Sequence, residues 1–330
     1  MMNKSMKALF LGNVAADTAE GIRDRLPPEL QCDILPDPKD LARRPETTAA
    51  ADILVSNHWR ADYPPAPRVR FVQSVATGTE LIDLAALPRG VAVCNVSGHE
   101  SAIAEYVLMT MLVWSHRFLE IEGEFRAHSS WRPSWVQSGA PHGEILGKTL
   151  GIVGLGRVGR EVAQRAAAFG VRVLAANRSP RPAGEGVERV FPLGELDAML
   201  PECDFVVLAT ALGPGTEGLL DARRLNLMKP SAFLINIARG AILDEAAVYE
   251  ALRARRIAGA ALDVWWQYPD AAEPARRPSR LPFHELPNVI MTPHCSGWTD
   301  GMMARRWAEV VDNLTRFVRG APLANIVTVT

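Results

Sequence analysis

Residues 149–170 carry a glycine pattern that is typical of nucleotide-binding turns. The apolar run TLGIV leads into Gly154-Leu155-Gly156-Arg157-Val158-Gly159, and an alanine-rich helical stretch follows. In this context the first glycine allows a tight turn, the second lets a pyrophosphate approach the backbone, and the third lets the helix pack on the strand. The pyrophosphate would lie against N–H groups at the positive end of the helix. We therefore predict that Gly154, Gly156, Arg157, Val158 and Gly159 bind a dinucleotide.

The next predicted strand, VRVLAAN, ends in residues that favour a phosphorylated ribose. NAD enzymes commonly carry Asp or Glu there, which accepts hydrogen bonds from the two ribose hydroxyls. This chain instead has Asn177, Arg178 and Ser179, with Arg181 close behind. A carboxylate would repel a 2′-phosphate, whereas a guanidinium and a hydroxyl would bind it. The prediction is NADP rather than NAD, and the alternative that these arginines are solvated loop charges stays open.

Short apolar runs alternate with helical segments, which predicts two series of parallel βαβ units that position these residues. In the first series we expect helices at 15–25 and 81–87 and strands at 7–12, 52–56, 69–75 and 91–95. In the second series we expect strands at 149–153, 172–175, 205–209, 232–237, 259–264 and 289–291.

Helices and a connection join and close these series. Ser97 and Glu100 fit an S-x-x-E capping box that would open a long apolar helix ending near His116. The stretch 129–142, rich in Trp and Pro, is interpreted as a surface connection. A helix at 303–319 is expected to close the chain.

Composition argues against several classes of protein. The 330 residues have a formal net charge of −1 with no basic stretch, so a nucleic-acid partner is not supported. The apolar run 102–114 is shorter than the roughly 18–20 residues of a membrane span. Four scattered cysteines predict reduced, buried thiols in a cytoplasmic protein. The chain has no H-x-x-x-H and no G-x-S-x-G motif, so neither a metal site nor a serine hydrolase is expected.

Three further motifs make the chain resemble one family. Asn236-Ile237-Ala238-Arg239-Gly240 resembles the N-x-[AS]-R-G signature of the D-isomer-specific 2-hydroxyacid dehydrogenases. Residues 261–265 (ALDVW) are similar to their A-L-D-V-[FW] strand end, and Thr292-Pro293-His294 to their T-P-H signature. With the glycine motif these fall in the family's order and spacing, so the resemblance covers essentially the whole chain.

The resemblance implies an α/β fold of two Rossmann-like domains with parallel sheets, one flavodoxin-like and one dinucleotide-binding. Residues 1–97 with 298–330 would form the substrate-binding domain, and residues 98–297 the inserted dinucleotide-binding domain. The apolar helix that Ser97 opens would be the hinge and the contact of a homodimer.

The implied activity is hydride transfer between a nicotinamide and the second carbon of a 2-oxo or 2-hydroxy acid. Arg239 matches the family's catalytic arginine, and its planar, charged fork suits holding the substrate carboxylate and polarising the carbonyl. His294 would be the general acid in reduction and the base in oxidation, since its pKa lies near working pH. As cofactor contacts the resemblance adds Thr210, Ile237, Ala238 and Asp263.

Residues 75–79 (VATGT) resemble the family loop whose backbone amides receive the substrate carboxylate, which singles out Thr77 and Gly78. Glu80 stands where the family has a shorter Asp, so the loop departs from the pattern there. Asn57, with His58 and Trp59, follows the predicted strand 52–56 and is expected on the other side of the pocket.

The family pattern also has a glutamate five residues after the strand-end Asp, where it hydrogen-bonds the histidine. Counting from Asp263, that position holds Tyr268, followed by Pro269. A second alignment stays open, because Glu273 and Pro274 preserve the acid if five residues are inserted before them. We favour Tyr268, since strand geometry positions the nearer residue better than a loop does. A phenol orients the imidazole without stabilising its charge, which predicts a lower histidine pKa.

Together these observations predict an NADP-preferring D-2-hydroxyacid dehydrogenase that acts mainly as a reductase of glyoxylate, hydroxypyruvate or larger aliphatic 2-oxo acids. Trp265, Trp266 and Trp298 would either pack in the core or line an apolar pocket wall. One alternative is a nucleotide-sensing, corepressor-like binding protein on the same fold. Another is a formate-type dehydrogenase, because Gln267 lies one position from the glutamine of those enzymes.

Overall fold

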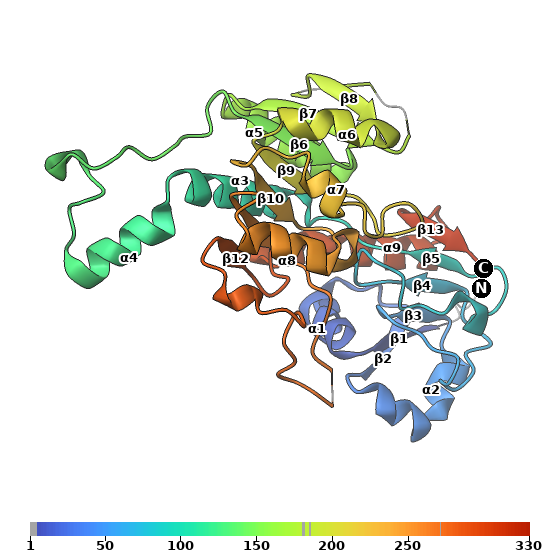
Figure 1. Cartoon of the computed structure of the whole chain (residues 1–330). Coiled ribbons are helices and arrows are strands. Elements are labelled where there is room, and N and C mark those ends of the chain that lie inside the picture. Colours follow the sequence, from blue (N-terminus) through green and yellow to red (C-terminus); the bar gives the residue numbers. More distant parts are fainter. Residues whose placement is uncertain (1–4, 180–181, 185, 271) are drawn as a thin grey trace. The chain divides into compact units, whose positions relative to one another are not determined.

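The computed structural model describes residues 5–179, 182–184, 186–270 and 272–330. It divides into two compact units: unit 1, residues 1–98 with 299–330, and unit 2, residues 99–298. Each unit is built on a mainly parallel sheet with helices packed on it, as the alternating sequence pattern predicts (Figure 1).

Within the described residues, the sheet of unit 1 has the strand order β13-β5-β4-β3-β1-β2. Its parallel strands are β1 (Met6–Leu11), β2 (Leu30–Leu35), β3 (Ile53–Val55), β4 (Phe71–Gln73) and β5 (Ala92–Cys94). The edge strand β13 (Ile326–Val329) pairs antiparallel with β5. From β1 the chain adds β2 on one side and β3, β4 and β5 on the other, so the switch point where α/β sheets bind ligands lies between β1 and β3.

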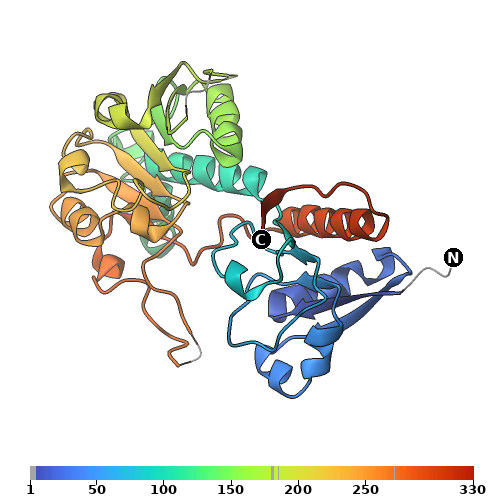
Figure 2. The same cartoon turned by 90° about the vertical axis from the view of Figure 1, so that its right-hand side faces the viewer.

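Helices of unit 1 cover the sheet with apolar side chains. Among the described residues they are α1 (Asn13–Ile22), α2 (Pro45–Ala50) and α9 (Asp300–Val318). Val310 and Leu314 of α9 join Phe10 and Phe71 of the sheet in one fully buried cluster. α9 lies along the sheet in Figure 2 and packs closely on α1, since a Cβ at Gly21 would lie 2.5 Å from the Trp307 ring.

In the described part of unit 2, the strand order is β12-β11-β10-β9-β6-β7-β8, and the paired strands are all parallel. The strands are β6 (Thr149–Val153), β7 (Arg172–Asn177), β8 (Arg189–Pro192), β9 (Phe205–Leu208), β10 (Phe233–Asn236), β11 (Gly259–Leu262) and β12 (Val289–Met291). Here the switch point lies between β6 and β9.

Apolar clusters cover both faces of this sheet. The helices are α3 (Glu100–Ser115), α4 (Phe118–His128), α5 (Arg157–Ala168), α6 (Leu196–Met199), α7 (Ala222–Leu225) and α8 (Glu245–Arg253). On one face Val107 of α3 and Val162 of α5 pack with Ile152 of β6, all fully buried. On the other face Val248 of α8 packs with Leu234 of β10. A sheet covered on both sides leaves its strand ends as the places for polar chemistry.

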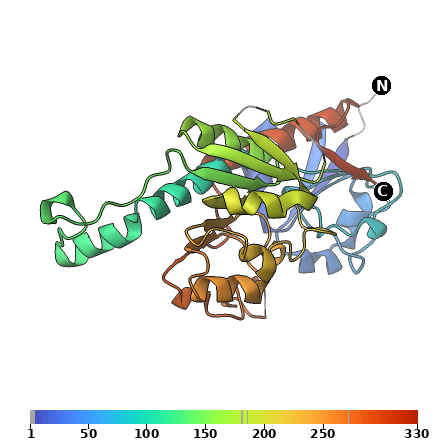
Figure 3. The same ribbon diagram turned by 45° about the horizontal axis from the view of Figure 1, so that its top comes forward.

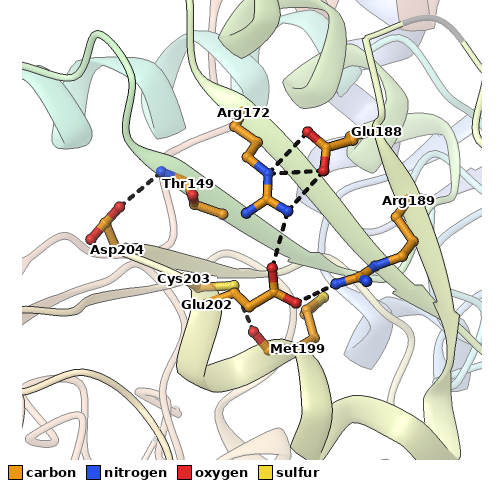
Figure 4. A network of polar contacts seen from close by, with 8 residues as sticks. All are labelled: Thr149, Arg172, Glu188, Arg189, Met199, Glu202, Cys203 and Asp204. Carbon is orange, nitrogen blue, oxygen red and sulfur yellow. Dashed lines mark hydrogen bonds and ion pairs between the residues drawn. The ribbon is translucent and has the colours of Figure 1, made fainter.

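The starting edge of this sheet is held by charged pairs (Figure 4). The Arg172 guanidinium at the start of β7 contacts Glu188 at 2.8 Å and Glu202 at 3.0 Å, and Arg189 also pairs with Glu202. Arg172 holds the pKa of both glutamates below its usual range. These pairs tie β7, β8 and the turn before β9 together, so they have a structural role at the edge opposite the glycine turn.

α4 projects away from the sheet of unit 2, as Figures 1 and 3 both show. It follows Arg117, whose φ is 51°, and it has no buried residue. Phe118, Leu119 and Phe125 are 55%, 61% and 47% exposed. The sequence prediction missed this helix. Across the described residues, no helix combines the length and apolar character that crossing a membrane requires.

Several predicted elements are wrong in detail. The capping box is one, because α3 begins at Glu100 without a side-chain cap and Ser97 instead bonds Glu309 through its N–H (2.7 Å) and its hydroxyl. The helix expected at 81–87 is a single turn, Leu84–Ala86.

Three strands were missed for a common reason. β2, β8 and β13 each have at least two exposed positions and no clear apolar pattern, so their pairing with neighbouring strands is what identifies them. The cysteine prediction is half wrong: Cys94 and Cys203 are buried, whereas Cys32 and Cys295 are exposed.

Candidate active site

The glycine turn joins β6 to α5 at the switch point of unit 2. Gly154 has a φ of 103°, and a Cβ on it would lie 2.7 Å from the Ala209 carbonyl oxygen at the end of β9. A Cβ on Gly159 would lie 2.2 Å from the Gly154 carbonyl oxygen, so the first and third glycines allow close packing. Gly156 is exposed and a Cβ there would meet nothing within 4 Å. The turn therefore leaves an open approach to its second glycine.

The N-terminus of α5 faces this opening. Gly156 precedes the helix, and no side chain caps it. Arg157 is exposed, with its guanidinium 3.9 Å from the Glu100 carboxylate, while Val158 is half-buried. A twelve-residue helix with an uncapped first turn favours an anion at this end. These residues fit the pyrophosphate of a dinucleotide.

Asn177, the last residue of β7, ties the glycine turn to the loop that follows. Its Oδ1 accepts from the Leu155 N–H at 3.2 Å, and its Nδ2 donates to the Ser179 carbonyl at 2.8 Å. The side chains of Arg178 and Ser179 are exposed. Arg181 lies outside the described residues. The end of β7 thus presents a guanidinium and a hydroxyl and no carboxylate.

The remaining predicted cofactor contacts follow β9 and β10. The Thr210 Cα would lie 2.8 Å from a Cβ on Gly154, so its backbone borders the turn. Ile237 and Ala238 are buried after β10. All three lie at the carboxyl edge of the sheet.

Arg239 is held by the turn that ends β10. The buried Asn236 accepts from the Ala238 N–H at 3.1 Å and donates to the Arg239 carbonyl at 3.0 Å. Arg239 Nη1 donates to the Ala238 carbonyl at 2.8 Å. A Cβ on Gly240 would lie 2.4 Å from the Trp265 backbone, so only glycine fits there. Asn236 is the first residue of the motif, but its role in holding the turn depends on hydrogen bonds that the motif alone does not reveal.

Asp263 holds the loop that carries His294. Its side chain is fully buried, and its oxygens accept hydrogen bonds from the Thr292 hydroxyl (2.6 Å), the Cys295 N–H (2.9 Å) and the Ser296 N–H (3.0 Å). His294, inside this turn, has a φ of 57°. Asp263 was predicted as a cofactor contact, but the contacts that it makes here are those of an anchor for the histidine loop.

Tyr268 is the side chain beside His294. Its hydroxyl oxygen lies 2.9 Å from His294 Nδ1 and 3.3 Å from the Trp265 N–H, which donates to it. Glu273, the alternative partner, instead pairs with Arg276 at 2.7 Å. The phenol thus occupies the place that the family pattern gives to a carboxylate.

The electrostatic environment favours the neutral form of both side chains. Desolvation lowers the pKa of His294, the charge of Arg239 lowers it further, and the buried Asp263 opposes both. Although His294 is exposed as a whole residue, its imidazole is packed on the Tyr268 side, with ring centroids 5.6 Å apart. Desolvation raises the pKa of Tyr268, so its hydroxyl stays protonated and can donate to Nδ1.

Trp265 and Trp266, which follow β11, pack against other side chains of unit 2, whereas Trp298 is mostly exposed. Trp265 is 6% exposed, and its Nε1 donates to the Thr292 carbonyl at 2.8 Å. Trp266 stacks on Phe283 with centroids 5.5 Å apart. Trp298 is 60% exposed and remains a surface side chain of unit 2.

The predicted substrate residues belong to unit 1 and follow two neighbouring strands. Asn57, after β3, has its Oδ1 3.0 Å from His58 Nδ1. In the loop after β4, the Thr77 carbonyl accepts from Asn95 Nδ2 at 2.7 Å and the Gly78 carbonyl accepts from the Ser74 hydroxyl at 3.4 Å. These hydrogen bonds from side chains of unit 1 to the loop carbonyls fix the path of the loop.

Comparisons with known proteins agree with this geometry. The family model for the D-isomer specific 2-hydroxyacid dehydrogenase, NAD binding domain, matches residues 108–296. The chain is 36% identical over 263 residues to a glyoxylate reductase of Thermococcus kodakarensis, covering 77% of this chain and 75% of that protein. It is 32% identical over 297 residues to a D-3-phosphoglycerate dehydrogenase of Mycobacterium leprae, covering 89% of this chain but only 52% of that longer protein.

A solved structure extends the likeness to the whole chain. A D-isomer specific 2-hydroxyacid dehydrogenase family protein from Aeromonas salmonicida superposes with a TM-score of 0.82 at 27% identity, covering 98% of this chain and 99% of that one. The family match spans more than half of the chain, and relatives above 30% identity cover more than two thirds of it. The chain belongs to the D-isomer specific 2-hydroxyacid dehydrogenase family.

Proposed function

We propose that this protein reduces small 2-oxo acids to D-2-hydroxy acids with NADPH. The observation that carries the proposal is the group of Arg239, Tyr268 and His294 at the carboxyl edge of the unit 2 sheet, the edge that also holds the glycine turn. Family membership supports an oxidoreductase, and the relative named glyoxylate reductase supports a small 2-oxo acid.

Each residue has a chemical task in this proposal. The bound nicotinamide supplies the hydride. The Arg239 guanidinium pairs with the substrate carboxylate and draws electron density from the 2-oxo group. Protonated His294 donates the Nε2 proton to the oxygen that becomes the hydroxyl. The Tyr268 oxygen accepts a hydrogen bond from Nδ1–H of the imidazolium, and this bond keeps the ring oriented while Nε2 gives up its proton.

The cofactor preference rests on the end of β7. Arg178 would pair with the 2′-phosphate of NADPH, and the Ser179 hydroxyl would donate to it. Asn177 orients both residues through its bond to the Ser179 carbonyl. Arg181 was predicted to help, and it lies outside the described residues.

Unit 1 would receive the substrate and unit 2 the dinucleotide. The backbone N–H groups of Thr77 and Gly78 would bind the substrate carboxylate, and Asn57, in the segment after β3, would lie on the other side of the substrate.

Two alternative functions are less well supported. Gln267, whose amide can donate to the Arg277 carbonyl and accept from Arg280 Nε at 3.2 Å each, is engaged away from His294, which argues against formate-type chemistry. A nucleotide sensor could keep Arg239 and His294, and the relatives named as a reductase and a dehydrogenase favour the enzyme over it.

Assembly and compartment belong to the same proposal. The exposed apolar residues of α4, an eleven-residue helix with no buried side chain, favour a second copy of the chain as their cover. The homodimer contact is thus proposed at α4 as well as at the predicted apolar helix α3. The four free cysteines fit the reducing cytoplasm.

The experiment is a turnover assay with NADPH and a panel of 2-oxo acids that includes glyoxylate and hydroxypyruvate. We expect NADPH consumption, and Arg239→Gln should lower kcat/KM by about 100-fold or more, because a transition-state charge partner is lost. The matched control is Arg253→Gln, which changes an exposed arginine paired with Glu250. Cofactor binding without turnover of any acid would support the sensor instead.

A further inference from the structure

The switch point of the unit 1 sheet carries a histidine that the proposed reaction does not use. Gly12 directly follows β1, and His58 lies in the segment after β3, the two neighbouring strands at the switch point. Gly12 has a φ of 93°, and a Cβ on it would lie 2.9 Å from His58 Cε1. The imidazole therefore lies directly on the glycine backbone, where any side chain would displace it.

Neighbouring groups select one tautomer of this ring. Nδ1 lies 3.0 Å from Asn57 Oδ1, which can only accept, so Nδ1 carries the proton. The Ser56 hydroxyl lies 3.4 Å from Nδ1. It lies closer to two carbonyl acceptors, that of His58 at 2.8 Å and that of Leu11 at 3.0 Å, so it donates to these rather than to Nδ1. Burial and the charge of Arg60 both lower the pKa of His58, so the ring is neutral at neutral pH.

Nε2 is consequently a hydrogen-bond acceptor. A neutral ring protonated on Nδ1 keeps a lone pair on Nε2. Throughout the described residues, Nε2 has no hydrogen-bond partner. Tyr63 packs against the imidazole in a T-shaped arrangement, with the ring centroids 6.0 Å apart and the planes at 79°, which braces the ring. A braced acceptor at a switch point is suited to an O–H donor on a small ligand.

His58 lies beside the loop that is proposed to bind the carboxylate. β4, whose following loop holds Thr77 and Gly78, is the direct neighbour of β3, after which His58 follows. Adjacent parallel strands lie about 4.8 Å apart, so the segments that follow them meet at the same edge of the sheet. A carboxylate bound by the loop after β4 can thus bring a hydroxyl on C3 to His58.

We propose that His58 is a specificity-determining residue whose Nε2 accepts the C3 hydroxyl of a 3-hydroxy-2-oxo acid. The substrate class is then that of hydroxypyruvate, preferred over glyoxylate or pyruvate, which offer no such donor. This inference rests on the proposed reductase function. Asn57 is a positioning residue here, since it acts through the tautomer of His58.

The test compares kcat/KM for hydroxypyruvate and glyoxylate with NADPH. The wild type should favour hydroxypyruvate, and His58→Leu should lower the ratio of the two constants about tenfold, the worth of one hydrogen bond. The drop should appear mainly as a higher KM for hydroxypyruvate. His58→Gln, which keeps an acceptor, should recover part of the ratio. His284→Leu, at a half-exposed histidine of unit 2, is the matched control and should leave the ratio unchanged.

Asn57→Leu provides an independent route if His58→Leu does not fold. It releases Nδ1 without removing the ring, and the ratio should fall by less than in His58→Leu. Equal ratios in the wild type and in either variant would overturn the inference while leaving the reductase function intact, because both acids are still turned over. A wild type that reduces neither acid would overturn the proposed function and this inference with it.

Discussion

The Tyr268 hydroxyl lies 2.9 Å from His294 Nδ1, so a neutral phenol contacts the candidate proton donor. Desolvation dominates the lowered pKa of His294, and Arg239 adds to it. A carboxylate in this place would offset that desolvation by attracting the imidazolium, and a phenol does not. The identity of residue 268 should therefore decide the pH range in which the protein reduces its substrate.

The first prediction concerns that pH range. Reduction needs protonated His294, so kcat/KM should fall as pH rises through the His294 pKa, which lies below the ordinary value of about 6.5. Tyr268→Glu should raise that pKa and move the falling limb upward by about one pH unit or more. The measurement is the pH dependence of kcat/KM for reduction with saturating NADPH.

Tyr268→Phe is the control for this experiment. It removes the hydrogen bond without adding charge, so it should lower kcat while the limb stays at low pH. Coincident limbs in the wild type and Tyr268→Glu would refute the link between residue 268 and the histidine pKa.

The second prediction concerns Asp263. The Asp263 carboxylate now accepts hydrogen bonds from N–H and O–H donors, and Asp263→Asn would place an amide NH₂ group against some of these donors. We therefore expect the free energy of unfolding to fall by about 2–3 kcal/mol. Urea unfolding followed by tryptophan fluorescence measures this change. Asp17→Asn, at an exposed position of α1, should leave the unfolding midpoint where it is. An equally unchanged midpoint for Asp263→Asn would show that the carboxylate does not anchor the loop.

The third prediction concerns cofactor choice. Arg178→Asp should weaken NADPH binding by about 10- to 100-fold, because the 2′-phosphate loses its partner. NADH binding should stay the same or tighten, because the new carboxylate can accept hydrogen bonds from the ribose hydroxyls. The quantity to measure is the Kd of each nucleotide, which does not depend on the substrate. Arg319→Asp makes the same charge change at an exposed site of unit 1. If both nucleotides were affected alike, Arg178 would be a solvated loop charge.

The fourth prediction concerns assembly. The wild type should have twice the chain mass in size-exclusion chromatography with light scattering. Leu119→Glu should yield monomers, because it places a charge on the exposed apolar side chains of α4. Leu81→Glu, at a leucine of unit 1 that is 67% exposed, should remain dimeric. A monomeric wild type would refute the proposed homodimer.

Local patterns were enough to predict most of the fold and part of the candidate site. The glycine turn depends on residues within six positions of one another, and its strand and helix are adjacent in the chain. The buried strands of unit 2 are nearly continuous apolar runs, so composition alone reveals them. The motifs around Arg239 and His294 indicate hydride-transfer chemistry on a 2-oxo acid through their resemblance to one family, without information on side-chain contacts.

Contacts across long sequence separations required the tertiary structure. Tyr268 and Glu273 were both possible partners of His294, and the path of the intervening loop decides which reaches a ring 26 residues away. β13 pairs with β5 although more than two hundred residues separate them in the sequence. The short, mostly exposed run of β13 does not predict this pairing.

The amino-acid sequence by itself determined the family and the glycine turn and indicated the candidate residues for binding charge and moving protons, because each motif lies within a few consecutive positions. The tertiary structure alone decided that a phenol contacts the histidine, that Asp263 anchors the histidine loop and that His58 keeps an accepting nitrogen. These depend on which side chains meet after burial, and burial is a property of the folded chain rather than of any local segment.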